Sequence, residues 1–389
     1  MRILNLQGCA HMASNGKKKL INKAHYLLGC RLDNWIRLLF QNKFRISFNK
    51  IPMALMITFT SVLTFPIAVL EKLICNKKIK NTQVSADPIF ILGHWRSGTT
   101  YLQNILSRDP QFGWCDPVST TTFSISHILR KPLTKIELNA LKTARPMDNM
   151  EYKIDLPIED TFALATISPY SIIHMIAFPV HYKNYISGAF VSDLTNEQQE
   201  NWKKTYSYII KKITWFYGGK QLILKSPDNT AHVRQLLELY PNAKFVNIHR
   251  DPYTTVMSTI HMFKKQMEII QLSPLPEGDL DIILEDTIVY IFKRMYSELF
   301  EMEQELSDNM ITISYRELSS SPYKCIESIY KKLEIPNYDE AIPHIEKYID
   351  SQRNYVKNRF TITPRLRNKI NSELGFYFTH YGYEMETEN

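Results

Sequence analysis

Cysteine is scarce in this sequence, and the few cysteines are scattered. The 389 residues contain only 5 Cys, at positions 9, 30, 75, 115 and 325, and no two of them show a C-x-x-C spacing. An odd number of dispersed cysteines argues against a disulfide framework, and their spacing shows no zinc-binding pattern. We therefore expect a reducing compartment, the cytoplasm, and no bound metal.

Glycine-rich, proline-rich and low-complexity tracts are also missing. With 12 Gly, 19 Pro and 44% hydrophobic residues, the composition excludes collagen-like and disordered classes and allows a sizeable buried core. No internal repeat is present. The length fits one large domain or two modest ones.

Acidic residues are almost absent from the first fifty positions. This segment carries ten Lys or Arg against one acid, Asp33, which makes +9, so the total charge of +8 leaves −1 for residues 51–389. The basic character therefore belongs to an N-terminal arm. The arm lacks base-reading motifs, so nucleic acid is not an expected partner.

Charge is missing altogether from residues 51–70, and three interpretations of this stretch compete. Twenty uncharged residues are long enough to span a membrane, but a cytosolic body would then push the basic arm outward, against the positive-inside tendency. Pro52 and Pro66 further weaken a straight spanning helix. The second interpretation is a helix pair that is buried or belongs to the acceptor site. The third is association with anionic lipid through the arm.

We favour this third interpretation, with the face of Trp35, Leu38 and Leu39 taking part. Residues 1–85 are then a basic and apolar helical extension that is associated with the membrane. The contact is peripheral, through residues 1–75, at the inner face of the membrane.

From residue 88 onward, short apolar runs alternate with helical patterns, which is typical of a parallel α/β sheet. The expected strands are 88–92, 221–224, 244–248 and 310–314, and the expected helices are 99–107, 195–217, 231–240, 253–270 and 280–306. We predict an α/β fold over residues 86–389, a P-loop-like parallel sheet flanked by helices.

The strongest motif is Gly93-His94-Trp95-Arg96-Ser97-Gly98-Thr99-Thr100, which follows a strand and opens a helix. Glycines let the backbone curl so that successive N–H groups point at an anion, and the helix N-terminus adds partial positive charge. A kinase-type loop would need Lys where Thr99 stands, whereas the cation here is Arg96. A P-loop kinase or nucleotidase is therefore the disfavoured alternative, together with a non-catalytic membrane-binding module.

The run R-S-G-T-T at positions 96–100 resembles the 5′-phosphosulfate loop of sulfotransferases that use PAPS (3′-phosphoadenosine 5′-phosphosulfate). The wider string GHWRSGTTYLQNILSRDP is similar to a bacterial branch that is distantly similar to the tyrosylprotein enzymes and the cytosolic sulfotransferases. The resemblance covers residues 88–380 and leaves out the arm. It implies that Arg96, Ser97, Gly98, Thr99 and Thr100 bind the donor, and that no metal is needed.

Three further residues match positions with known roles in that family. Arg250 follows the strand at 244–248, and Ser258 stands eight residues later; the resemblance implies that they hold the 3′-phosphate. An Arg at a strand end can bind a phosphate through two parallel hydrogen bonds. Lys225 corresponds to the family lysine at the bridging oxygen, where an ammonium stabilises the charge that develops during in-line transfer.

The remaining donor contacts rest on the resemblance alone. Tyr101 and Tyr315 match family positions near the adenine, and Lys357 and Arg359 match the late basic loop that completes the 3′-phosphate pocket.

No residue of the sequence is an obvious general base for the transfer. Cytosolic members of the family carry a His two residues after the lysine, where this chain has Pro227. The leading candidates are Glu159 and Asp160, followed by His94 inside the phosphate loop, and last Asp116.

Of the two substrates, the acceptor is the one that the sequence determines least. The uncharged segment 51–70 and the apolar run 167–185 favour a small lipophilic alcohol such as a sterol or a lipid. Carbohydrate and protein tyrosine acceptors stay open.

Overall fold

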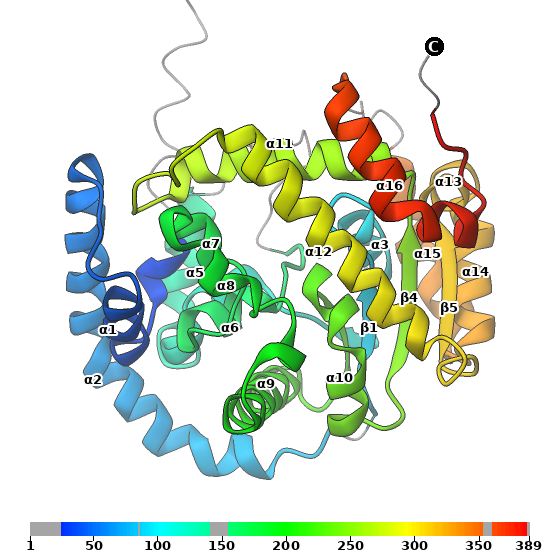
Figure 1. The fold of residues 1–389 in the computed structure, drawn as a ribbon. Coiled ribbons are helices and arrows are strands. Elements are labelled where there is room, and N and C mark those ends of the chain that lie inside the picture. Colours follow the sequence, from blue (N-terminus) through cyan, green and yellow to red (C-terminus); the bar gives the residue numbers. More distant parts are fainter. Residues whose placement is uncertain (1–24, 85, 141–154, 353–359, 387–389) are drawn as a thin grey trace, which may run out of the picture.

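Five parallel strands form one sheet at the centre of the protein (Figure 1). The computed structural model describes residues 25–84, 86–140, 155–352 and 360–386, with backbone only for 136–140. The strands are β1 (Ile89–Leu92), β2 (Phe112–Gly113), β3 (Gln221–Lys225), β4 (Lys244–His249) and β5 (Met310–Ser314), in the spatial order β2-β3-β1-β4-β5. The predicted α/β fold is confirmed; the two-residue strand β2 was not predicted, because it is too short to show a pattern.

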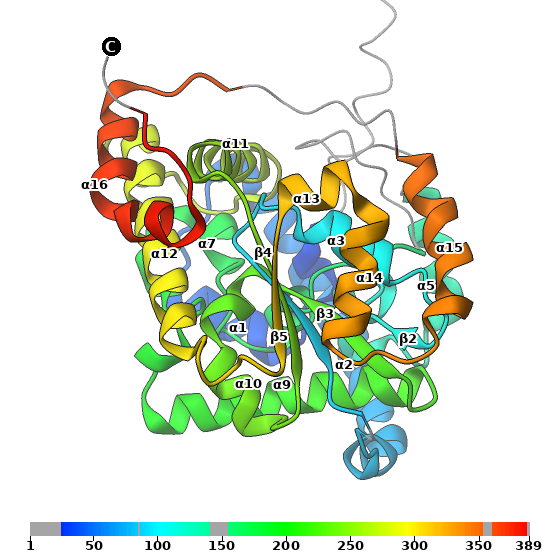
Figure 2. The ribbon, with the colours of Figure 1, turned by 90° about the vertical axis from the view of Figure 1, so that its right-hand side faces the viewer.

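Helices cover both faces of the sheet (Figures 1 and 2). On one face α3 (Thr99–Leu106), α14 (Pro322–Lys332) and α15 (Tyr338–Ser351) pack against Ile91, Ile223 and Val246. On the other, α9 (Asn196–Phe216), α12 (Leu280–Met302) and α16 (Pro364–Tyr381) share a core with Phe90 and Phe245. Successive strand residues point to opposite faces, so burial on both sides explains why the central strand β1 is apolar throughout.

The other helices connect these layers. They are α1 (Leu32–Gln41), α2 (Ile51–Asn81), α4 (Pro117–Thr121), α5 (Arg130–Ala140), α6 (Thr161–Ile167), α7 (His174–Ala177), α8 (Lys183–Ile186), α10 (Val233–Leu239), α11 (Pro252–Ile270) and α13 (Tyr315–Ser320), with 3-10 turns η2 (Tyr26–Gly29), η3 (Phe48–Lys50), η4 (Phe123–Ile125), η5 (Pro179–His181), η6 (Val191–Asp193) and η7 (Pro227–Ala231).

Local sequence accounts for where several helices begin. Thr195 and Gln198 form a reciprocal capping box at the start of α9. At α11 the Asp251 side chain accepts from the N–H of Thr254, and Pro252 occupies the first turn, where its missing N–H is harmless. The turn at Asp251 thereby fixes the direction in which α11 leaves the end of β4.

The apolar run 167–185 belongs to the core. Ile172, Met175 and Phe178 are almost completely buried among the short helices α6, α7 and α8. The structure therefore does not support the expectation that this run lines an acceptor pocket.

The uncharged segment forms one continuous helix, α2, instead of a helix pair. It accommodates Pro66 in its interior and lies along the outside of the body (Figure 1). Tyr26, Trp35 and Ile57 from the N-terminal segment share the main core with the sheet and its helices. In the described part of the chain, Phe48–Asn81 is long and apolar enough to cross a membrane by length and composition.

Candidate active site

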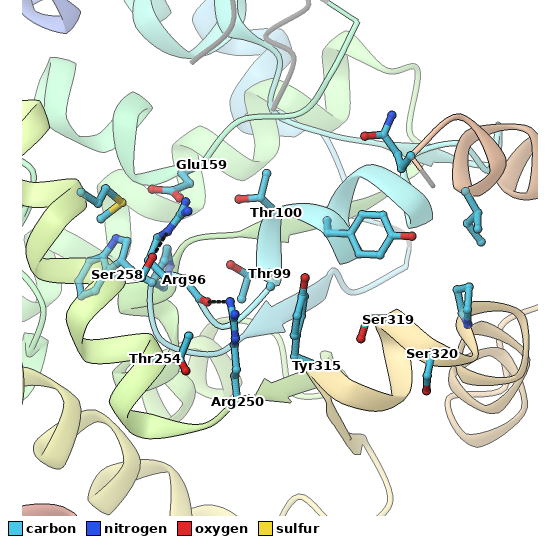
Figure 3. Close-up of a pocket in the computed structure, with 18 of the residues that line it drawn as sticks. Arg96, Thr99, Thr100, Glu159, Arg250, Thr254, Ser258, Tyr315, Ser319 and Ser320 are labelled. Atoms are coloured by element: carbon cyan, nitrogen blue, oxygen red, sulfur yellow. Dashed lines mark hydrogen bonds between the residues drawn. The ribbon is translucent and has the colours of Figure 1, made fainter. Parts of the chain in front are cut away.

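A cleft of about 580 Å³ opens at the carboxyl ends of four adjacent strands (Figure 3). Arg96 follows β1, Lys225 ends β3, Arg250 follows β4 and Tyr315 follows β5. In open parallel sheets this edge is where ligands bind, because the loops after neighbouring strands meet there.

The loop between β1 and α3 has the backbone that close approach to an anion requires. Arg96 has φ 70° and Gly98 has φ 109°. A Cβ added at Gly98 would lie 2.4 Å from Cδ2 of Tyr315, so only glycine fits there. The first N–H groups of α3 have no partner within the helix, and they point out of its N-terminus beside Thr99 and Thr100. Ser97 is buried and donates to the carbonyl of His94 at 2.8 Å, so it braces the loop.

The residues predicted to hold two separate phosphates lie side by side in this cleft. Nε of Arg96 donates to Oγ of Ser258 at 3.0 Å, and Nη1 of Arg250 donates to the carbonyl of Arg96 at 3.2 Å (Figure 3). The Arg250 guanidinium also stacks on Tyr315, 4.4 Å from the ring centroid. The two anion-binding groups therefore face a common space.

Aromatic and hydroxyl side chains lie beyond Tyr315. Tyr101, Ser319, Ser320 and Tyr323 line the cleft. Burial, and then the nearby phenols of Tyr348, Tyr315 and Tyr323, raise the pKa of Tyr101 to about 12. Rings gathered in this way offer a planar base surfaces for stacking. Lys357 and Arg359 lie outside the described residues, so their predicted role remains a prediction.

Lys225 and Glu159 meet at the other end of the cleft. Nζ of Lys225 lies 2.6 Å from Oε1 of Glu159 and 3.4 Å from Oγ1 of Thr100. Glu159 lines the cleft, next to the phosphate loop. The lysine is thus within reach of both the loop that would bind a 5′-phosphosulfate and the carboxylate.

The structure separates Glu159 from its neighbour. Asp160 is buried, and its Oδ2 accepts from the Tyr206 hydroxyl at 2.7 Å and from Nδ2 of Asn229 at 3.2 Å. Burial raises the pKa of Asp160, against the hydrogen bonds that lower it. It anchors the start of α6 and does not line the cleft.

His94 and Asp116 also point away from the cleft. The His94 ring is fully buried against Phe292, 4.7 Å between ring centroids, and burial lowers its pKa to about 3. Asp116 caps α4 through the N–H of Ser119 and forms an ion pair with Arg130 at 3.0 Å. Each of these side chains contributes to the packing of the scaffold, which leaves Glu159 as the predicted base that lines the cleft.

Sequence reasoning missed the contacts that hold Glu159 in place. The Ser226 hydroxyl accepts from the N–H of Thr161 at 2.9 Å, and the Thr161 hydroxyl donates to Oδ2 of Asp228 at 3.1 Å. They tie the segment before α6 to the loop after β3, over more than sixty residues of chain. Thr254, one turn before Ser258 on α11, was missed as well, although its i, i+4 spacing from Ser258 could have indicated it.

A cleft of this kind suits an enzyme that binds a nucleotide with two anionic groups and transfers one of its substituents. The chain belongs to the sulfotransferase family, whose sequence model matches residues 88–340. It is therefore a transferase, as the phosphate loop predicted. Among the described residues, no group of three His, Cys, Asp or Glu side chains is placed to hold a metal ion.

The chain is also similar to one sequence relative and to two solved structures. The chain is 28% identical over 367 residues to the omega-hydroxy-beta-dihydromenaquinone-9 sulfotransferase Stf3 of Mycobacterium bovis, covering 92% of both chains. Its fold is similar to that of sulfotransferase STF9 from Mycobacterium avium, with TM-score 0.65, 15% identity and coverage of 92% and 98%. Sulfotransferase STF1 from Mycobacterium tuberculosis gives TM-score 0.61, 15% identity and coverage of 89% and 94%.

Proposed function

We propose that this enzyme transfers the sulfuryl group of PAPS to the hydroxyl of a lipophilic alcohol. The observation that carries the proposal is the cleft itself, in which two anion-binding groups flank a space and the Lys225–Glu159 pair stands at one end. PAPS has the matching chemistry, with a 5′-phosphosulfate, a 3′-phosphate and an adenine.

Different residues of the chain bind different groups of the donor. The N-terminus of α3, with Thr99, Thr100 and the Arg96 guanidinium, binds the 5′-phosphosulfate. Arg250 and Ser258 bind the 3′-phosphate, and Tyr101 and Tyr315 contact the adenine. Arg250 is pre-oriented by its stacking on Tyr315 and its hydrogen bond to the Arg96 carbonyl, so little side-chain entropy is lost on binding.

Transfer then needs one proton acceptor and one cation. The acceptor oxygen attacks sulfur in line while the bond between sulfur and the bridging phosphate oxygen breaks, and 3′,5′-diphosphoadenosine leaves with the electron pair. The Glu159 carboxylate takes the proton from the attacking hydroxyl. The Lys225 ammonium stabilises the negative charge that develops on the bridging oxygen, and this interaction is stronger in the transition state than in the ground state.

Part of the cleft lining is apolar. Trp95 precedes Arg96, Pro227 follows Lys225 by two residues, and Met262 lies one turn beyond Ser258, and all three line the cleft. Phe360 also lines it and lies 5.5 Å from the ring of His261. The relative Stf3 is named for a hydroxylated dihydromenaquinone. Both observations support a hydrophobic molecule with one hydroxyl as the acceptor.

A donor and acceptor screen tests the proposal. The enzyme is incubated with labelled PAPS and a panel of hydroxylated isoprenoid quinones, sterols, phenols, sugars and tyrosine peptides. We expect label in the lipophilic alcohols and release of 3′,5′-diphosphoadenosine without added metal. Transfer only to sugars or peptides would refute the acceptor class. Turnover of ATP with Mg²⁺, and no affinity for 3′,5′-diphosphoadenosine, would refute the donor.

We also infer a cytoplasmic location. The four described cysteines, Cys30, Cys75, Cys115 and Cys325, are all free thiols and all buried. A reducing compartment suits them.

A further inference from the structure

Helix α2 is inverted relative to an ordinary surface helix, because its apolar side faces outward. Fourteen residues between 51 and 74 are exposed, and thirteen of them are apolar, Lys72 being the exception. The largest exposed side chains include Leu55 (63%), Phe59 (65%), Leu63 (58%) and Leu73 (76%). A soluble protein rarely leaves a continuous apolar strip of this size in water.

The side of α2 that faces the body carries the polar anchors. The Ser61 hydroxyl donates to the carbonyl of Cys30 at 2.9 Å, and the indole of Trp35 donates to Thr58 at 2.9 Å. Glu71 is buried, pairs with Lys212 at 2.5 Å, and accepts from the N–H groups of His127 and Ile128 at 3.0 and 2.9 Å. These bonds are distributed along α2, so the helix is fixed lengthwise against the body.

A second element continues the same surface. The aromatic rings of Phe40 (66% exposed), Phe44 (56%) and Phe48 (90%) project from α1 and the turn that follows it. Lys43 and Phe44 hold positive φ angles of 51° and 55°, a backbone that L residues adopt only under constraint. The strained turn presents Phe44 and Lys43 together at the tip.

Cations stand at both ends of this surface. Arg37, Lys43 and Arg45 are exposed at the α1 end, and Lys72, Lys77, Lys78 and Lys80 are exposed toward the end of α2. An apolar strip between cations matches a bilayer with anionic headgroups, where apolar side chains enter the acyl boundary and cations contact phosphate. A two-fold dimer through this face would instead bring cations against cations.

We propose that α1, η3 and the outer face of α2 form a surface that inserts into an anionic lipid bilayer, with α2 lying in the membrane plane. Spanning would require α2 to leave the body, which would break the ion pair between Glu71 of α2 and Lys212 of α9 and carry an unpaired carboxylate toward the hydrocarbon. With α2 in the membrane plane, the body lies on one side of the membrane, and the hydrogen bonds and ion pair that hold α2 against the body stay intact.

The surface is connected to the cleft by α11. Ser258 and Met262 of α11 line the cleft, and just beyond the other end of α11 the carbonyl of Leu272 accepts from the N–H of Ser47, the residue before η3, at 2.8 Å. Ser258 and Ile270 are twelve residues apart on the helix, about 18 Å at 1.5 Å per residue. A lipophilic acceptor held in the bilayer would have a short path to the cleft; this consequence rests on the proposed function, whereas membrane binding does not.

Vesicle sedimentation with the full chain tests the surface. We expect binding to phosphatidylglycerol vesicles, weaker binding to phosphatidylcholine vesicles, and loss at high salt. The double variant Phe59→Ser/Leu63→Ser should bind about 100-fold more weakly, because two buried apolar side chains are lost. The matched control replaces Tyr290 and Met385, which are exposed at 47% and 42% elsewhere on the body, with serine; it should bind like the parent.

A separate pair of variants tests how much the cations of this surface contribute to vesicle binding. Lys43→Gln/Arg45→Gln should weaken binding about fivefold per cation, whereas Lys331→Gln/Lys332→Gln on α14 should have no effect. A soluble dimer that Phe59→Ser/Leu63→Ser converts to a monomer, absence of vesicle binding by the parent chain, or equal losses in the control variants would overturn the proposal. So would resistance of the bound protein to extraction at alkaline pH, which indicates a span.

The same variants separate this proposal from the proposed function. Phe59→Ser/Leu63→Ser should retain transfer to a water-soluble alcohol while vesicle binding is lost. Lys225→Ala should lose transfer and retain vesicle binding.

Discussion

Lys225 and Glu159 form an ion pair of 2.6 Å at the base of the cleft, although 66 residues separate them in the chain. The Lys225 side chain is 3% exposed and that of Glu159 is 18% exposed. A buried ammonium needs a compensating carboxylate. Because Glu159 also lines the cleft, the carboxylate that pairs with Lys225 is also the one that we propose as the proton acceptor. The catalytic effects of the two residues should therefore be coupled.

Glu159→Gln should lower the rate of transfer by about 10²- to 10⁴-fold, because the attacking hydroxyl loses its proton acceptor. Affinity for 3′,5′-diphosphoadenosine should change little, since the amide keeps the size of the side chain. Single-turnover rates at saturating donor and calorimetric titration measure the two quantities. Glu268→Gln, an exposed carboxyl on α11, is the control. A Glu159→Gln enzyme with the parental rate would show that another group is the base.

Lys225→Ala and Arg250→Ala should affect different steps. Lys225→Ala should slow the chemical step by several orders of magnitude, with donor affinity largely kept. Arg250→Ala should weaken donor binding about 10- to 100-fold, the range expected for lost hydrogen bonds to a charged group. Equal loss of donor affinity in both variants would contradict this division of roles.

Gly98→Ala should abolish donor binding. The added methyl would lie 2.4 Å from Cδ2 of Tyr315, at a φ of 109° that alanine rarely adopts. Gly278→Ala is a matched control, because Gly278 has a similar φ of 102° and its nearest neighbour would be 3.8 Å away. Thermal melting should show the cost of the positive φ in both variants and the added cost of the clash only in Gly98→Ala, and calorimetry should show lost donor binding only in Gly98→Ala. Intact binding by Gly98→Ala would mean that the loop can move away from Tyr315.

Asp228 should make the protein less stable as the pH rises. Burial, and then the charges of Asp160 and Glu159, raise the pKa of Asp228 to about 8. The native state therefore holds a proton that the unfolded chain, with a carboxyl pKa near 4, has lost. This contribution to stability is complete below about pH 4 and is lost as the pH approaches about 8.

Asp228→Asn should remove this part of the pH dependence. Melting temperatures of the parent and the variant, measured from pH 5 to pH 9, should converge at the acidic end and diverge at the alkaline end. A difference of about 1 kcal/mol would shift the melting temperature by roughly 2 °C. Parallel curves for the two proteins would show that Asp228 titrates normally.

Glu71→Ala should destabilise the protein by about 3–5 kcal/mol, because it leaves the buried ammonium of Lys212 without its partner. Burial already lowers the pKa of Lys212, against the Glu71 charge that raises it. Replacing both residues by methionine should recover most of the loss. Urea unfolding measures both effects, and a double variant no more stable than Glu71→Ala would contradict the assignment.

The strands of the sheet and the phosphate loop could be predicted because their signals are local. The run at 310–314 matches β5 completely, and the predicted helix at 253–270 differs from α11 by one residue. The resemblance singled out Arg96, Arg250 and Ser258, and the structure brings them to one cleft because each lies at a fixed offset from the end of a strand. In a parallel sheet, those ends necessarily meet at one edge.

Local sequence signals could not distinguish the roles of candidate residues that are close together in the chain. Glu159 and Asp160 are adjacent carboxylates, and His94 lies two residues from Arg96. Whether each side chain lines the cleft or is buried depends on its contact with Lys225, Tyr206 or Phe292, and these three residues come from distant parts of the chain.

By itself, the sequence of this protein determined its alternation of strands and helices, the anion-binding loop and the side chains that follow each strand, because backbone geometry and hydrophobic periodicity act over a few residues. Only the tertiary structure decided which carboxylate faces Lys225 and which side of α2 the body leaves uncovered. Burial is set by whichever distant segment packs against a side chain, and the uncharged stretch 51–70 of α2 shows no strongly preferred face until the body covers one.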